Sequence, residues 1–277
     1  MDKNSRFSYS KESKQIELFE PDNNSDVCIK SDSNIKNPLN ISGYSKVDGT
    51  LPINLICVIS GGTTREKDFL NELVKKKTFS NIRVIFVSTK QNEGGLTPKM
   101  MNDKYSQIVS EKKMTYQGVT ITIDAIDSFY MFTDVDHYED ELVSIVSTSK
   151  NEEKSTWIIS NPSIEIWIYY CYRSTPYEDL KSIFSVKPSE RSSHLKTING
   201  TFNSGGGLDP RKAFEKLQDG INNSKQFYTV DDNNIPKLLS TNMFVFAEDV
   251  LNQLGVEYEK WKDQKLAWRN SMKNQHP

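Results

Sequence analysis

The stretch Ile53-Asn54-Leu55-Ile56-Cys57-Val58-Ile59, closed by Ser60-Gly61-Gly62, decides the fold. It is short, β-branched and apolar on both alternating faces, which is typical of a strand buried in the middle of a parallel sheet. Residues 63–76 follow with apolar pairs at helical spacing, and Thr63-x-x-Glu66 matches a capping box. We therefore expect a central strand that leads directly into a helix.

Strands and helices continue to alternate along the chain after this first pair. Further strands are predicted at 82–88, 119–123, 128–133 and 156–159, with helices at 99–112 and 138–150 between them. This order predicts an α/β fold with a mostly parallel sheet flanked by helices. From about residue 161 the pattern becomes helical, at 161–172, 176–185, 189–197, 209–224, 240–254 and 256–270, with Gly255 as a C-cap.

Residues 1–50 differ from the rest because they are rich in Ser, Asn, Asp and Lys and have no apolar period. They are predicted to form a disordered or loosely docked arm, and residues 51–277 one α/β domain with its helical part from about 161. The net charge of -2 excludes a chain-wide cationic field for nucleic acid. Three scattered cysteines, no signal-peptide pattern and no long apolar run favour a cytoplasmic protein without a membrane span.

Asp134-Val135-Asp136 is the first candidate for chemistry, because it follows the apolar strand 128–133. Open α/β sheets carry their sites at the carboxyl ends of strands, and carboxylates two residues apart suit a hard cation such as Mg²⁺. The alternative is an ordinary acidic turn at a strand exit.

Ser160-Asn161-Pro162-Ser163-Ile164-Glu165 is the second candidate, and it follows the strand 156–159. Asn161 as N-cap and Pro162 as first helical residue predict that a helix starts at once, at the same edge of the sheet. Glu165 then lies on a helix that is apolar nearly all round. Its carboxylate needs a metal, the helix dipole or a basic partner.

The turn Ser60-Gly61-Gly62-Thr63-Thr64-Arg65-Glu66 is the third candidate. Its backbone amides and Arg65 could hold a phosphate at a helix N-terminus. Glu66 is explained more simply as the capping partner of Thr63. No serine, cysteine or threonine has a nucleophile motif around it, so covalent catalysis is not supported.

Three blocks in this order resemble the RloB family of bacterial antiphage defence proteins. They are ICVISGGTTREKDFL, FYMFTDVDHYED and IISNPSIEIWIYYCY, and the resemblance runs from about Leu51 to Leu254. It implies a Toprim-like fold, often encoded beside an AAA/ABC-type ATPase. It also implies a Mg²⁺ (or Mn²⁺) site on Asp134, Asp136 and Glu165, with phosphate contacts from Ser60, Gly61, Arg65 and Asn161.

One block departs from the family pattern. Ser60 stands where the first motif of the family has a Glu, and Arg65 stands where it has a second one. Glu66, one residue away, could take over; the two Asp with Glu165 could suffice for a metal; or the site could be inactive. The loss of the Glu removes a carboxylate placed for proton transfer, which should weaken catalysis.

The resemblance implies two functions. One is a metal-dependent nuclease that cleaves DNA or RNA, tRNA being one candidate, with Asp134, Asp136, Glu165 and Glu66 as its catalytic residues and an ATPase as its partner. The other is a degenerate module that binds a nucleic acid or a protein without cleaving. The sequence leaves the oligomeric state open, including a homo-oligomer.

Overall fold

The computed structural model describes residues 54–75, 78–79, 82–89, 95–124, 127–135, 138–149, 155–176, 178–202 and 207–275. Residues 106–124 form one compact unit, and the other described residues form a second, larger one. The predicted N-terminal arm lies outside the described residues, and so does Asp136. In the part of the chain that is described, no helix combines the length and apolar character needed to span a bilayer.

A five-stranded sheet forms the centre of the larger unit, in the order β2-β1-β5-β6-β7. The first four strands are parallel, and β7 pairs antiparallel with β6. Their bounds are Asn54–Ser60 (β1), Ile82–Val87 (β2), Ser128–Asp134 (β5), Ser155–Asn161 (β6) and Ser240–Thr241 (β7). The predicted α/β fold with a mostly parallel sheet is therefore confirmed.

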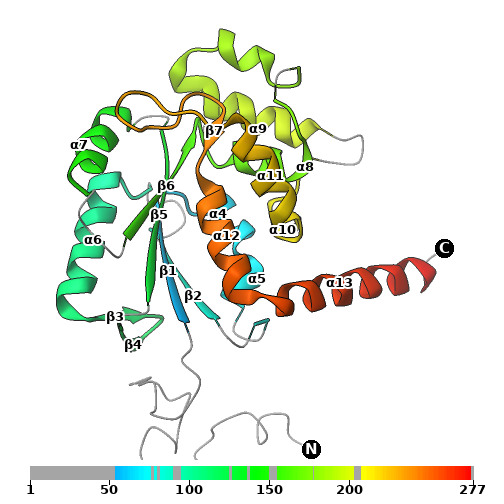
Figure 1. Cartoon of the computed structure of the whole chain (residues 1–277), viewed down its shortest axis with the longest axis horizontal. Helices are drawn as coiled ribbons and strands as arrows, with labels where there is room; N and C mark the ends of the chain where they lie inside the picture. The colour runs from blue at the N-terminus through cyan, green and yellow to red at the C-terminus, as the bar shows by residue number, and fades with distance from the viewer. Residues whose placement is uncertain are drawn as a thin grey trace, which may run out of the picture. The chain divides into compact units, whose positions relative to one another are not determined.

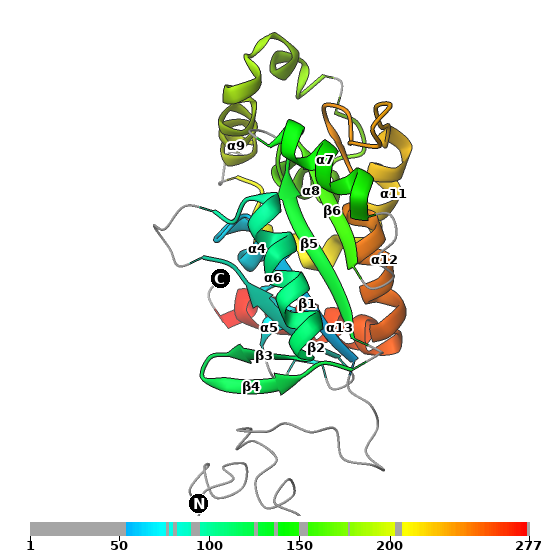
Figure 2. The ribbon, with the colours of Figure 1, turned by 90° about the vertical axis from the view of Figure 1, so that its left-hand side faces the viewer.

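Helices cover both faces of this sheet (Figure 1). One face carries α7 (Glu139–Ser149) and the first turns of α6 (Pro98–Glu111), as Figure 2 shows, and Tyr105 packs edge-on against Phe129 there. The remaining helices of the unit lie on the opposite side, either on the sheet itself or packed on the helices that cover it. These are α4 (Arg65–Phe69), α5 (Asn71–Val74), α8 (Glu165–Tyr172), α9 (Arg191–Thr201), α10 (Pro210–Ala213), α11 (Leu217–Phe227), α12 (Met243–Leu254) and α13 (Val256–Gln275), with short 3₁₀ turns at Lys181–Ser185, Pro188–Glu190 and Phe214–Lys216.

The helical part differs from the prediction mainly in how its segments are divided. The single helix expected at 63–76 is two short ones, α4 and α5, which meet at Leu70. The segment 176–185 contains a short 3₁₀ turn, and the segment 209–224 is split into α10, a 3₁₀ turn and α11. Gly255 ends α12 as predicted, with a φ of 49° that favours glycine and an N–H that donates to the Leu251 carbonyl.

The core on the α8 face is built around fully buried aromatic side chains. Trp167 of α8 packs edge-on against Phe69, and Phe246 of α12 packs against Tyr130 and Phe132 of β5. Burying side chains of this size contributes about 1.5 to 3 kcal/mol each through the hydrophobic effect. This packing holds α8 against α4 and α12 against β5.

We expect Gly220→Ala to destabilise the protein by about 1 to 3 kcal/mol, because α11 passes very close to α8. A methyl group at Gly220 would lie 2.7 Å from the Trp167 ring and 2.8 Å from the Cys171 sulfur. Urea denaturation followed by tryptophan fluorescence measures the change. Gly200→Ala in α9 is the matched control: its added methyl meets nothing within 4 Å, so it should leave stability unchanged or raise it by up to about 1 kcal/mol.

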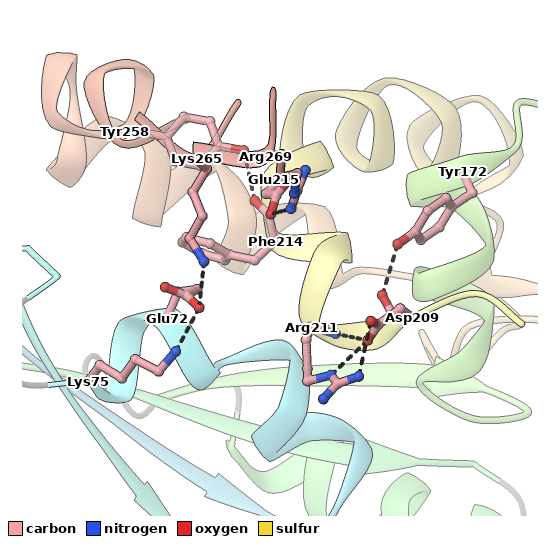
Figure 3. Close-up of polar contacts among 10 residues, drawn as sticks. All are labelled: Glu72, Lys75, Tyr172, Asp209, Arg211, Phe214, Glu215, Tyr258, Lys265 and Arg269. Atoms are coloured by element: carbon pink, nitrogen blue, oxygen red, sulfur yellow. Dashed lines mark hydrogen bonds and ion pairs between the residues drawn. The ribbon is translucent and has the colours of Figure 1, made fainter. Parts of the chain in front are cut away.

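The helix α13 is fastened to the larger unit by ion pairs as well as by packing (Figure 3). Lys265 of α13 and Lys75 both bond to the buried carboxylate of Glu72, at 3.1 and 2.8 Å. Arg269, further along α13, pairs with Glu215. Although burial opposes it, the two lysines lower the pKa of Glu72.

The smaller unit contains a β-hairpin, of which the sequence predicts only the second strand. Its strands are β3 (Lys113–Tyr116) and β4 (Val119–Thr122), paired antiparallel. Gln117 and Gly118 form the two-residue turn, and both have positive φ, 51° and 77°. Positive φ at both central residues is typical of a type I′ hairpin turn.

Candidate functional site

The candidate site lies where β1, β5 and β6 end. From β1 the chain crosses to β2 on one side, and β5 lies on the other side of β1. Such a reversal of strand order opens a crevice at the carboxyl edge of a sheet. Ser60 pairs with Phe132, and Asp134 pairs with Ser160, so the three strand ends are adjacent.

Asp134 is the last residue of β5, and its carboxylate reaches across to the start of α8. Its Oδ1 accepts a hydrogen bond of 3.0 Å from the backbone N–H of Ile164. Burial raises the pKa of Asp134 well above its ordinary value, and the negative charges of Glu66 and Glu165 add to this; Lys196 opposes them. Asp134 is therefore held among other carboxylates.

Glu66 of α4 is buried, with 6% of its surface exposed. Its carboxylate oxygens lie so close to Gly62 that a methyl group there would come within 2.1 Å of both of them. Burial, together with the charge of Glu165, raises the pKa of Glu66 to about 7, against the opposing effects of its own backbone N–H, Lys196 and Arg65. A carboxyl group with this pKa can accept or release a proton near neutral pH.

The capping-box interpretation of Glu66 is wrong. The helix α4 begins at Arg65 with Thr64 as N-cap, and no side chain caps it. Glu66 and Asp134 instead line one small cavity of about 10 Å³, together with Ser160 and Ile164. That volume is close to what one water molecule occupies.

Glu165 is the first residue of α8 and has 2% of its surface exposed. Within the described residues, neither of its carboxylate oxygens has a hydrogen-bond partner. Arg65 is the nearest basic group, with its Nε 3.7 Å from Glu165 Oε1 and 44% of its side chain exposed. A buried carboxylate without hydrogen bonds is unfavourable, so Glu165 is suited to a ligand that neutralises it.

Asn161 is not the N-cap of α8, contrary to prediction. It is the last residue of β6, and its peptide bond to Pro162 is cis. Its side-chain amide donates a hydrogen bond to the Pro236 carbonyl. The helix begins only at Glu165, with Ile164 as N-cap. Pairing of Asn161 with Ser240 of β7 extends the strand and delays the helix.

In the turn after β1, the backbone amides predicted to bind phosphate donate hydrogen bonds to other groups of the protein. The Gly61 N–H donates to the Phe132 carbonyl at 2.9 Å, and the Gly62 N–H donates to Ser60 Oγ at 3.2 Å. Ser60 is fully buried. Of the residues predicted to contact phosphate, Arg65 is the one whose exposed side chain lines the large cavity beside the carboxylates.

That cavity has a volume of about 460 Å³ and is bordered by Glu165 and Arg65. Its other basic residues could not be predicted from the sequence; they are Lys196 of α9 and Arg211 and Lys212 of α10. They are far from Glu165 in sequence, and each reads as an ordinary charged helix position. Only the packing of α9 and α10 beside α8 brings them to the site.

The carboxylates have the chemistry for a divalent cation, although the described residues do not form a finished site. No group of three His, Cys, Asp or Glu side chains in the described ranges is arranged to hold a metal ion. The unpartnered oxygens of Glu165 and the raised pKa values of Glu66 and Asp134 are nevertheless what a cation would relieve. The residues present therefore suit Mg²⁺ or Mn²⁺ by the type of their ligand atoms, and not by their arrangement.

Comparison with known proteins adds no relative. No protein-family model, curated protein or solved structure matches this chain.

Proposed function

We propose that the protein is a metal-dependent nuclease that hydrolyses phosphodiester bonds in DNA or RNA. The observation that carries this proposal is the convergence of Glu66, Asp134 and Glu165 at the carboxyl edge of the parallel sheet. The cavity beside them is lined by basic side chains, which suits a phosphate-containing substrate. The resemblance of the three sequence blocks to the RloB family supports the same activity.

Each carboxylate has a separate role in this proposal. Asp134 and Glu165 would hold Mg²⁺ or Mn²⁺, with Asp136 as a further ligand. The metal would supply Lewis-acid stabilisation of the charge that develops on the phosphate. Arg65, beside Glu165, would contact a non-bridging phosphate oxygen and orient it.

Glu66 would supply the proton transfer that the substitution at Ser60 removes. With its pKa raised to about 7, its carboxylate can take the proton of the attacking water near neutral pH. Of the accounts compatible with the sequence, the one in which Glu66 replaces the missing Glu is supported by its burial beside Asp134.

The experiment is a cleavage assay on single-stranded RNA, tRNA, plasmid DNA and linear duplex DNA, with Mg²⁺, Mn²⁺ or EDTA. We expect cleavage with a metal and its loss in EDTA and in Asp134→Asn. Because the resemblance also implies an AAA/ABC-type ATPase partner in antiphage defence, each reaction is run with and without the neighbouring ATPase. Full activity of Asp134→Asn would contradict the proposal.

A second function is a module that binds a nucleic acid or a protein without cleaving it. The absence, within the described ranges, of three carboxylates arranged for a metal favours it. Calorimetric titration with Mg²⁺ separates the two functions. Metal uptake that disappears in Asp134→Asn supports the nuclease, whereas no uptake, with partner binding intact, supports the binding module.

A further inference from the structure

The cavity beside the carboxylates has the size of a site for one small ligand. Its volume of about 460 Å³ falls in the range of roughly 300 to 1,000 Å³ found for small-molecule sites. Its walls come from α4, α8, α9 and the segment 207–212. One nucleotide fits in this volume, but a double helix, whose grooves alone are about 6 to 12 Å wide, cannot enter.

The basic side chains of the cavity suit a phosphate group. Lys196 and Lys212 are exposed, and neither forms an ion pair within the described residues. Arg211 is held in place by Asp209, with its Nε 3.0 Å and its Nη2 3.2 Å from the two carboxylate oxygens (Figure 3). Together with Arg65, they give the cavity four basic side chains against three acidic ones, Asp68, Glu165 and Asp209, and the two lysines are the cations that no carboxylate holds in an ion pair within the described residues.

Two residues that line the cavity, Asn199 and Glu165, also carry buried acceptor oxygens. Asn199 is 4% exposed, and its Nδ2 donates to the Glu165 carbonyl. Its Oδ1, like both carboxylate oxygens of Glu165, has no hydrogen-bond partner in the described part of the chain. An unpaired nucleotide has free amino and hydroxyl donors for such acceptors, whereas base pairing in a duplex uses the amino groups.

We infer that the cavity binds one unpaired nucleotide of a single-stranded nucleic acid, so the nuclease acts on single strands or on strand ends. Lys196, Lys212 and Arg65 contact its phosphate, and Asn199 contacts its sugar or base. Glu165 borders both the cavity and the carboxylate cluster, so the bound phosphate lies next to Asp134 and Glu66. This inference rests on the proposed function and names its class of substrate.

Fluorescence anisotropy in EDTA tests the inference without any cleavage. The probes are a fluorescein-labelled single-stranded RNA and DNA of one sequence, and the same strands annealed into blunt duplexes. We expect both single strands to bind at least about tenfold more tightly than the duplexes. Lys196→Gln with Lys212→Gln should weaken binding about tenfold and reduce the slope of its salt dependence.

Two controls distinguish binding in the cavity from non-specific electrostatic attraction of the nucleic acid. Lys104→Gln with Lys260→Gln removes the same charge from exposed positions that do not line the cavity, and should leave binding unchanged. Gly200→Phe tests the volume without a charge change. Gly200 lines the cavity and a Cβ there meets nothing within 4 Å, so a benzyl side chain would take up part of the cavity volume, whereas the methyl group of Gly200→Ala would take up little.

Equal binding of duplexes, or unchanged binding by Gly200→Phe, would overturn the inference. Different outcomes contradict the proposed nuclease function and the proposed role of the cavity. Strand binding in EDTA without metal-dependent cleavage contradicts the nuclease alone, whereas cleavage that survives Gly200→Phe contradicts the cavity alone.

Discussion

Glu66→Gln should reduce nuclease activity by at least about 100-fold and, in the same protein without metal, raise its stability. General base catalysis typically contributes about 10²- to 10⁴-fold, which sets the expected loss. The gain in stability arises because Glu66 is buried next to Asp134 and Glu165, where its charged form is unfavourable. A residue that costs stability and supplies activity is typical of a functional site.

The gain should depend on pH in a defined direction. Burial raises the pKa of Glu66 from 4.5 to about 7 in the folded protein. Folding is therefore favoured below pH 4.5, and this contribution is lost as pH rises from about 4.5 to 7, because the unfolded chain releases the proton first. Gln does not ionise, so Glu66→Gln does not lose this stability. The free energy of unfolding of the variant should therefore exceed that of the wild type by an amount that grows through this pH window, to on the order of 2 to 3 kcal/mol at pH 8.

Urea denaturation in EDTA at several pH values measures this advantage, and Glu72→Gln is the matched control. Glu72 is equally buried, but Lys75 and Lys265 lower its pKa. Its contribution is present above its unfolded pKa and is lost on acidification, so Glu72→Gln should cost about 1 kcal/mol at pH 8 and leave cleavage unchanged. A Glu66→Gln protein that is less stable than the wild type at pH 8 would argue against a strained carboxylate cluster.

The parallel sheet could be predicted because its strands are buried on both faces. Such strands appear in sequence as short, continuous apolar runs; β1 is a run of aliphatic residues, and β5 is a run of mainly aromatic ones. The helix α12 could be predicted because its apolar stripe ends at a glycine with positive φ. In these cases the local pattern and the tertiary packing demand the same structure.

The prediction failed where distant contacts override a local pattern. Asn161 and Pro162 form a regular helix start in sequence, but Asn161 is taken into β6 by its pairing with Ser240. The strand β3 is not evident in the sequence because only Lys112 separates it from α6, and because Gln117-Gly118 is a less characteristic turn signal than Asn-Gly or Asp-Gly. Neither the pairing of Asn161 with Ser240 nor the pairing of β3 with β4 can be recognised from the local sequence pattern.

Some residues of the candidate site could likewise be predicted from the sequence, and others could not. Asp134 ends β5 and Glu165 comes four residues after the end of β6, so their place at one edge of the sheet follows from the strand pattern. Glu66 was assigned to a cap because Thr63 lies three residues before it, yet its side chain is buried with the other carboxylates. The basic wall of the cavity comes from α9 and α10, whose packing on α8 the sequence does not encode locally.

Phe214→Ala should destabilise the protein by about 3 to 5 kcal/mol, the cost typical of removing a buried aromatic ring. Phe214 is fully buried and joins the sheet-covering helices to α13. Its ring lies 6.2 Å from that of Phe69 in α4 and 5.2 Å from that of Trp261 in α13, and its carbonyl accepts from the Tyr258 hydroxyl at 2.8 Å.

Tryptophan fluorescence and far-UV circular dichroism during urea denaturation measure this loss. Phe184→Ala is the matched control, because Phe184 is 56% exposed and its removal should change stability by no more than about 0.5 kcal/mol. Because Phe214 follows α10 directly, its removal should also loosen the Arg211 and Lys212 wall of the cavity. Single-strand binding should therefore weaken in Phe214→Ala even at low temperature, where the protein is still folded, and remain intact in Phe184→Ala.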